Sequence, residues 1–124
     1  MFKHVRTCSR PAVTLFGGMT VFAKETLAVI FCAQRTEEDD SGYAVAADKM
    51  EELAARQPGY RGMDHARNPD GSGITISYWA TDEDAKAWRD NPDHTAIRET
   101  GRGKWYGSYS LHVARIERSY DWEK

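Results

Sequence analysis

The chain has 124 residues, the length of one ordinary globular domain, and can bury a hydrophobic core without metal ions or disulfides. Lys and Arg number 17 against 19 Asp and Glu, and the pI near 6.1 argues against a general role in binding nucleic acid or anionic lipid. No apolar run approaches the roughly 20 residues that span a bilayer. The four Trp, six Tyr and four Phe indicate a folded chain despite a mean hydropathy of −0.70.

Residues 1–23 are interpreted as an extension that precedes a domain at 24–124. Its apolar piece, Ala12–Phe16, is shorter than the roughly 7 to 15 residues of a secretory signal, so export is not expected. Met19 would serve as a natural start for the domain. The extension is therefore expected to be a flexible arm, a strand that docks on a partner, or an upstream-start artefact. The two cysteines, Cys8 and Cys32, have no paired spacing, which favours the cytoplasm.

The first predicted elements are a strand at 26–35 and a helix that follows it. Residues 26–35 form an apolar run that is short for a helix and rich in β-favouring residues, which predicts a strand buried on both faces. The acidic turn at 36–42 suits a helix N-terminus, and Pro58 with Gly59 ends the helix. Apolar residues recur between them at helical spacing: Tyr43, Ala46, Ala47, Met50, Leu53 and Ala54.

A hairpin is predicted next, with strands at 60–68 and 74–80 joined by a Gly-rich loop at 69–73. Thr81 and Asp84 resemble a capping box and open a short helix that runs through Trp88.

The segment after Trp88 predicts a second short helix and a last strand. Pro92 fits the first turn of this helix, on which His94, Ile97, Gly101 and Trp105 share one stripe. Alternating residues from 106 to 120 then predict a long final strand.

This element order is β, α, β, β, α, β, which predicts an α+β fold of the ferredoxin-like type with an antiparallel sheet. Helices on one face of such a sheet leave the other face open. Leu27, Val29 and Phe31 would lie on one face, and the other face is also apolar because it holds Ala28, Ile30 and Cys32. The open face therefore favours a two-fold homodimer in which two sheets pack face to face.

Several short motifs follow one another as in small antibiotic biosynthesis monooxygenase-like proteins, and the chain resembles that superfamily over residues 26–120. The motifs are Ala28–Phe31, Gln34-Arg35, Gly42-Tyr43, Met50, Gln57–Tyr60, Gly73–Trp79, Trp88, His94, Gly101-Arg102, Trp105-Tyr106 and Tyr109. The resemblance implies a dimeric α+β barrel with a cavity between sheet and helices. It also implies oxidation of polycyclic phenols by dioxygen without a cofactor or, as in other relatives, binding and opening of haem.

His94 is the first candidate catalytic residue, because it resembles the helix histidine that recurs in this superfamily. An imidazole with a pKa near 6.5 could take a proton from a phenol, or it could ligate haem iron. The alternative is a partly buried histidine whose ring is merely hydrogen-bonded. Arg35 and Arg102 are the other catalytic candidates, since either guanidinium could hold a phenolate, a carboxylate or a haem propionate. The alternative for each is an exposed salt bridge.

Aromatic residues are the candidates for substrate binding, because stacking suits a flat polycyclic ligand. Tyr78 and Trp79 point to opposite faces of their strand, so only one of them can face a given cavity. Trp88, Trp105 and Tyr109 extend the aromatic set around the junction of helix and strand. Packing in the core or in a dimer interface is the alternative for each ring.

No metal-ligand spacing, P-loop or dinucleotide fingerprint is present, so neither a metal site nor a nucleotide cofactor is expected. The leading hypothesis is a cofactor-independent monooxygenase that acts on an electron-rich phenol, with a small aromatic ligand and itself as partners. A haem-degrading monooxygenase with His94 on the iron is one alternative. A non-catalytic dimeric module for small-molecule binding or stress response is another. Nucleic-acid and membrane partners are not expected.

Overall fold

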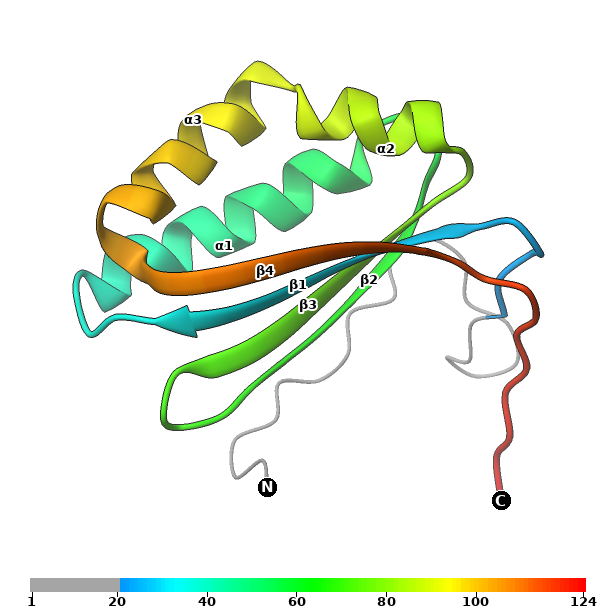
Figure 1. Ribbon diagram of the computed structural model, residues 1–124, viewed down its shortest axis with the longest axis horizontal. Coiled ribbons are helices and arrows are strands. Elements are labelled where there is room, and N and C mark those ends of the chain that lie inside the picture. The colour runs from blue at the N-terminus through cyan, green and yellow to red at the C-terminus, as the bar shows by residue number, and fades with distance from the viewer. Residues whose placement is uncertain (1–20) are drawn as a thin grey trace.

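The computed structural model describes residues 21–124, which form one antiparallel sheet with helices packed against a single face (Figure 1). The first 20 residues of the predicted extension 1–23 lie outside the described residues. The strands stand in the order β2-β3-β1-β4, which confirms the predicted ferredoxin-like fold. Their bounds are β1 Leu27–Arg35, β2 Tyr60–Arg67, β3 Ser72–Trp79 and β4 Tyr106–Arg115.

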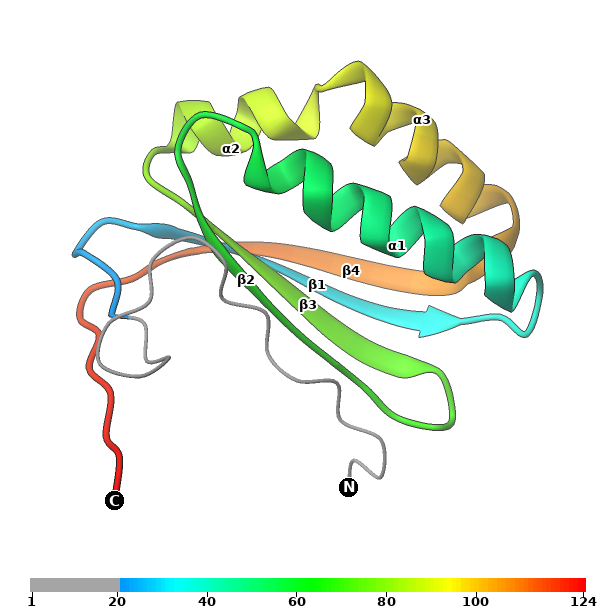
Figure 2. The ribbon, with the colours of Figure 1, turned by 180° about the vertical axis from the view of Figure 1, so that it is seen from behind.

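Three α-helices and one turn of π-helix form the second layer, and Figure 2 shows α1 and α3 side by side over the sheet. Their bounds are α1 Asp40–Ala55, α2 Asp82–Arg89, α3 Pro92–Thr100 and η1 Gly101–Trp105. Within residues 21–124, no helix has the length and apolar character needed to cross a membrane.

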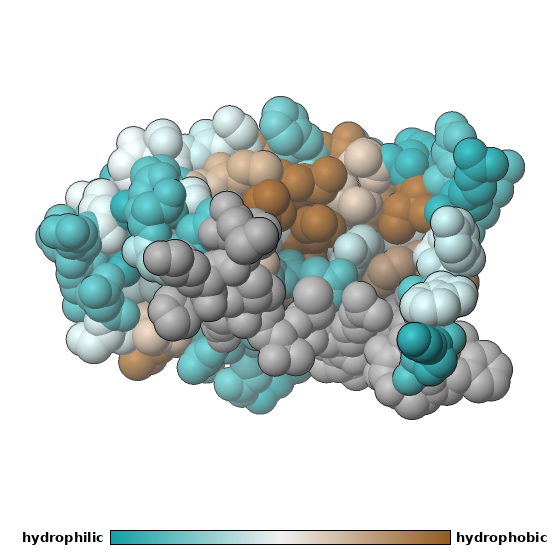
Figure 3. All heavy atoms as spheres, turned by 90° about the horizontal axis from the view of Figure 1, so that it is seen from below, coloured by the Kyte–Doolittle hydropathy of each residue, from teal (hydrophilic) through white to brown (hydrophobic). Residues whose placement is uncertain are grey.

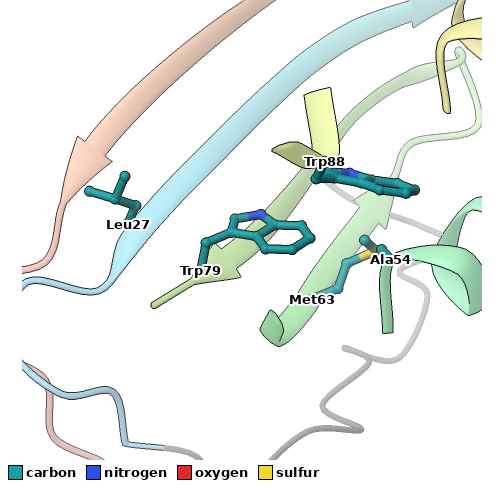
Figure 4. Close-up of a cluster of buried hydrophobic side chains, with 5 residues drawn as sticks. All are labelled: Leu27, Ala54, Met63, Trp79 and Trp88. Atoms are coloured by element: carbon teal, nitrogen blue, oxygen red, sulfur yellow. The ribbon is translucent and has the colours of Figure 1, made fainter. Parts of the chain in front are cut away.

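The core occupies the end of the space between sheet and helices where β3 runs into α2 (Figure 4). Trp79 is completely buried there, and its indole stacks on that of Trp88 with ring centroids 6.0 Å apart. The indole Nε1–H of Trp79 donates to the Ser77 hydroxyl at 2.9 Å, so this polar atom is satisfied inside the core. Leu27, Ala54 and Met63 complete the cluster.

Two short capped helices carry the chain from β3 to β4. The Thr81 hydroxyl accepts from the Asp84 backbone N–H at 3.1 Å and opens α2, as the capping box predicts. Asn91 opens α3 in the same way, because its side-chain oxygen accepts from the N–H groups of Asp93 and His94 at 3.0 and 3.3 Å. This cap therefore fixes the turn of helix that carries His94.

We expect Asn91→Ala to lower the free energy of unfolding by about 1 kcal/mol, because two N–H groups at the start of α3 lose their acceptor. Asn91→Asp is the matched control, since an aspartate caps a helix about as well as asparagine. Urea unfolding of the three proteins measures the difference. Equal midpoints for the alanine variant and the wild type would contradict the role given to this cap.

The end of α3 differs from the sequence prediction of one stripe that continues to Trp105. The α-helix ends at Thr100, and Gly101–Trp105 form a wider π-helical turn. Two glycines, Gly101 and Gly103, lower the α-helical propensity of this segment. The turn brings Trp105 against Tyr43 of α1, with an edge-to-face contact at 6.0 Å between centroids.

The final strand is also shorter than predicted, because β4 ends at Arg115 instead of continuing to residue 120. Arg115 pairs with Leu27, the first residue of β1, so the partner strand ends there. Alternation in the sequence continues past this point, but a strand needs a neighbour that supplies hydrogen bonds.

The sheet face without helices is apolar, as the sequence predicts, and hydrophobic side chains gather on it in Figure 3. Ile30 of β1 lies opposite Ile76 of β3 on this face. The edge strand β4 adds apolar surface on its helix side, where Leu111 and Val113 are 53 % and 55 % exposed. Contiguous apolar surface is typical of a region that another molecule covers.

Candidate functional site

A cavity of about 550 Å³ lies between the sheet and the helix layer, beside the hydrophobic core. Met63 and Trp88 of the core form one end of its lining, and Tyr106 and Arg67 lie at the other end. Between them the floor consists of side chains from the helix-facing side of β1, such as Val29 and Phe31. The cavity is large enough for a flat aromatic molecule of several rings.

His94 projects from the first turn of α3 into this lining and is held in one orientation. Its ring stacks on the Trp88 indole, with centroids 4.2 Å apart and planes inclined by 20°. The Nδ1 atom lies 2.7 Å from the Trp88 carbonyl oxygen, which can only accept, so Nδ1 carries a hydrogen. In the neutral ring Nε2 is then the nitrogen with a free lone pair.

The protonation of His94 is set by its surroundings. Burial lowers the pKa of the imidazole from its ordinary 6.5, and the charge of Arg98 lowers it further, against the opposing hydrogen bond to Trp88. The ring is therefore neutral at pH 7 and can act as a base at Nε2. Arg98 lies one helical turn after His94 and also lines the cavity.

The end of the cavity remote from His94 is built around the phenol ring of Tyr43. The Arg35 guanidinium carbon lies 4.0 Å from the centre of this ring, and that of Arg67 lies 4.7 Å from it. Arg67 also donates a hydrogen bond to the Tyr43 hydroxyl. Tyr106 packs edge-on against Tyr43 at 5.9 Å, and burial raises the pKa of Tyr106, so this phenol remains protonated.

Residues 27–100 match the family model described as antibiotic biosynthesis monooxygenase. The chain belongs to this family. It is also 44 % identical over 91 residues to the uncharacterised protein YqjZ of Bacillus subtilis. The matched region covers 73 % of this chain and 79 % of that protein. The resemblance drawn from the sequence is therefore confirmed.

Solved structures of low sequence identity share the fold of this family member. One is a protein of Nitrosomonas europaea, provisionally described as an antibiotic biosynthesis monooxygenase, with a TM-score of 0.67 at 16 % identity over 77 % of this chain and 93 % of that one. Another is a variant of SnoaB from Streptomyces nogalater, described as a cofactor-independent oxygenase. Its TM-score is 0.67 at 12 % identity over 76 % of this chain and 95 % of that one.

Five of the site residues proposed from the sequence line the cavity: His94, Arg102, Trp88, Trp105 and Tyr109. Arg102 lies at the rim, where its side chain is 53 % exposed and pairs with Glu99 at 3.1 Å. Its Nε–H also donates to the Tyr109 hydroxyl at 2.6 Å.

Three other proposed site residues lie outside the lining. Tyr78 is on the opposite face of the sheet, where its ring stacks on Phe22 at 4.0 Å and its hydroxyl donates to Asp64 at 2.9 Å. Trp79 is on the helix side but is enclosed within the core. Arg35 is directed toward its own loop, where it pairs with Asp40 at 2.7 Å and donates to the Trp105 carbonyl at 2.9 Å.

Three arginines of the cavity lining, Arg67, Arg89 and Arg98, were missed from the sequence. Arg98 has a recognisable signal, because residues four apart on a helix share a face and His94 was already a candidate. Arg67 ends β2 and carries no local motif that distinguishes it from other strand-end arginines. Within residues 21–124, no cluster of three or more His, Cys, Asp or Glu side chains could hold a metal ion.

Proposed function

We propose that this protein is a cofactor-independent monooxygenase that oxidises an electron-rich phenol with dioxygen. The observation that carries the proposal is His94, a neutral imidazole whose Nδ1–H is fixed by the Trp88 carbonyl and whose Nε2 is the basic atom in an aromatic cavity. Membership of the antibiotic biosynthesis monooxygenase family supports a monooxygenase. The shared fold with SnoaB, described as a cofactor-independent oxygenase, is consistent with a reaction that needs no cofactor.

The reaction begins when Nε2 of His94 takes the phenolic proton. The phenolate then gives one electron to dioxygen, and the resulting aryloxyl radical and superoxide combine to form a carbon–oxygen bond. The peroxide anion that results takes the proton back from His94. The hydroperoxide then loses water as the C–H bond of the oxygenated carbon and the O–O bond both break, which leaves a quinone. One dioxygen is consumed for each quinone and each water released, so no external reductant is needed.

The protein contributes orientation, charge and exclusion of water. The indoles of Trp88 and Trp105 and the phenol ring of Tyr109 provide aromatic walls. Arg98 lies on the same helix face as His94 and places a positive charge beside the developing phenolate, a role that Arg102 at the rim can share. Arg35 is assigned a different role, because its hydrogen bond to the Trp105 carbonyl holds η1 against the end of β1.

A homodimer is part of the proposal. The apolar sheet face around Ile30 and Ile76 supports it, because a second copy packed on this face would remove these side chains from water. Sedimentation of the purified chain measures the mass in solution.

The test of the activity is oxygen consumption with a panel of hydroxynaphthalenes in air-saturated buffer, followed together with quinone absorbance. One dioxygen taken up for each quinone formed, with one labelled oxygen atom in the product when ¹⁸O₂ is used, is the expected result. Failure to oxidise any member of the panel, although the ligands bind, would refute the proposed activity.

Haem binding is a second candidate, because a histidine whose Nδ1–H is held by a carbonyl can present Nε2 to iron. Haem would supply oxygen activation, with His94 as its ligand and Arg102 available to a propionate. Titration with haemin separates the two candidates. A Soret shift at one haem per protomer that is lost in His94→Ala would favour haem, whereas the proposed phenol oxidation predicts no such shift.

A further inference from the structure

Most of the charged residues that line the cavity are basic. Among its charged lining residues, five are basic (Arg67, Lys86, Arg89, Arg98 and Arg102) and two are acidic (Glu51 and Asp82). The chain as a whole has a formal net charge of −2, so the basic excess is local to this cavity. Basic groups that line a partly enclosed space favour an anionic ligand.

Most of these charges already have a partner of opposite sign. Asp82 pairs with Lys86 at 2.7 Å, and Arg102 pairs with Glu99. Arg89 pairs with its neighbour Asp90 at 2.9 Å. Among residues 21–124, Arg67 and Arg98 have no carboxylate within ion-pair distance.

Arg98 already donates to the Arg89 carbonyl oxygen at 3.2 Å and to the Thr95 hydroxyl at 3.4 Å, so Arg67 is the arginine with more donors left for a ligand. Its hydrogen bond to Tyr43 uses one of the five N–H donors of a guanidinium, and the others have no acceptor within the described part of the chain. The neighbouring phenol of Tyr106 stays protonated, because burial raises its pKa, and it is therefore a neutral donor. A carboxylate has the two acceptor oxygens that such a set of donors can bind.

The position of Tyr43 is secured independently of any ligand. Arg35 lies over its ring at 4.0 Å and is itself neutralised by Asp40. Trp105 contacts the same ring edge-on, and its indole N–H donates to Asp39 at 3.2 Å. The hydroxyl that accepts from Arg67 is therefore part of a rigid frame, which lowers the entropic cost of binding an anion there.

We propose that Arg67, Tyr43 and Tyr106 form a carboxylate-binding subsite at the end of the cavity remote from His94, so that the ligand is an aromatic acid. The proposal rests on the proposed function in that it places the acid group of the same substrate whose phenol faces His94. The backbone of Gly101 lies against the Tyr106 ring of this subsite, and Gly101 follows His94 by seven residues, a rise of about 10 Å along α3. A ligand that reaches both ends is therefore longer than a single-ring hydroxybenzoate.

The test compares 6-hydroxy-2-naphthoic acid with its carboxamide, which has the same shape and no charge. Dissociation constants at pH 7 are measured by calorimetry on the full chain, without oxygen. We expect the acid to bind at least tenfold more tightly than the amide, and added salt to weaken the acid alone. Arg67→Met is expected to weaken the acid by tenfold or more and to leave the amide within twofold, because it removes the guanidinium that is proposed to hold the carboxylate.

Two further variants keep the result interpretable. Tyr43→Phe retains the ring that Arg35 and Arg67 contact and removes only the hydroxyl, so it is expected to weaken the acid selectively even if Arg67→Met is poorly folded. Arg56→Met is the matched control, because Arg56 is an exposed residue that pairs with Glu52 away from the cavity. Its affinities for both ligands are expected to equal those of the wild type.

The outcomes separate this proposal from the proposed activity. Equal binding of acid and amide by the wild type, or equal loss of both in Arg67→Met and Tyr43→Phe, would overturn the carboxylate subsite. Phenol oxidation with no preference for acids would also overturn it and leave the activity standing. Selective binding of the acid with no oxidation in air would support the subsite and refute the oxygenase.

Discussion

His94→Gln is expected to slow aerobic oxidation of a bound phenol by about 10² to 10⁴-fold, the usual contribution of a general base. Glutamine can still donate an amide N–H toward the Trp88 carbonyl, but it cannot take a proton at pH 7. Binding of the phenol is expected to change little, because the aromatic walls are intact. Single-turnover absorbance for the rate and calorimetry for the affinity separate the two effects.

The pH dependence of the wild type gives an independent check. Because the pKa of His94 is lowered below 6.5, the fall in rate at acidic pH is expected to have its midpoint below 6.5, the midpoint of an unperturbed imidazole. The free energy of unfolding is expected to decrease over the same pH range. The unfolded chain takes up the proton first as the pH falls below 6.5, so the contribution of neutral His94 to stability is complete above 6.5 and is lost below it.

The matched control for this variant is His112→Gln, because His112 is an exposed histidine on β4 that pairs with Ile30 on the sheet face opposite the cavity. Its rate is expected to equal that of the wild type, with the oligomeric state of both variants verified by sedimentation. Unchanged turnover in His94→Gln would remove the proposed base. An equal loss in both variants would point to the assembly instead of the imidazole.

Trp79→Ala is expected to have the largest effect on stability, with a loss of about 3 to 5 kcal/mol in the free energy of unfolding. Trp79 is fully buried and contacts Trp88 and Tyr60, so the truncation leaves a cavity in the centre of the core. The Ser77 hydroxyl also loses the indole N–H that it accepts. Guanidinium unfolding followed by circular dichroism measures the change.

Two other tryptophan variants serve as a milder substitution and as a control. Trp79→Phe fills most of the same space, so its loss is expected to be smaller, and it remains measurable if Trp79→Ala does not fold. Trp122→Ala is the matched control, because Trp122 is 78 % exposed and its loss is expected to stay within about 0.5 kcal/mol. A Trp79→Ala protein that unfolds at the same denaturant concentration as the wild type would contradict the placement of this residue in the core.

The elements of the fold could be predicted closely because their signals are local. The acidic turn before α1, the Gly-rich loop of the β2–β3 hairpin, the capping box at Thr81 and the proline that opens α3 at position 92 each depend on residues a few positions apart. The ends of α3 and β4 were predicted less well. The length of β4 depends on where its partner β1 begins, which no residue of β4 encodes.

The site could be predicted only in part. His94, Trp88 and Trp105 were identified, because an imidazole and large rings on a helix stripe are visible in the sequence and all three line the cavity. Tyr78 illustrates the limit. Its alternation with Trp79 shows that the two face opposite ways, but which face the helices cover depends on long-range packing.

The sequence by itself determined the family, the order of strands and helices, and the presence of a histidine among aromatic rings, because periodicity and caps act over short distances. Only the tertiary structure decided which arginine serves the cavity. Arg35 and Arg67 both end strands. Asp40 neutralises Arg35, and the Trp105 carbonyl accepts a hydrogen bond from it, whereas Arg67 faces the cavity beside Tyr43. The charge available to a ligand depends on which groups the fold brings within hydrogen-bond distance, and these partners lie far apart in the chain.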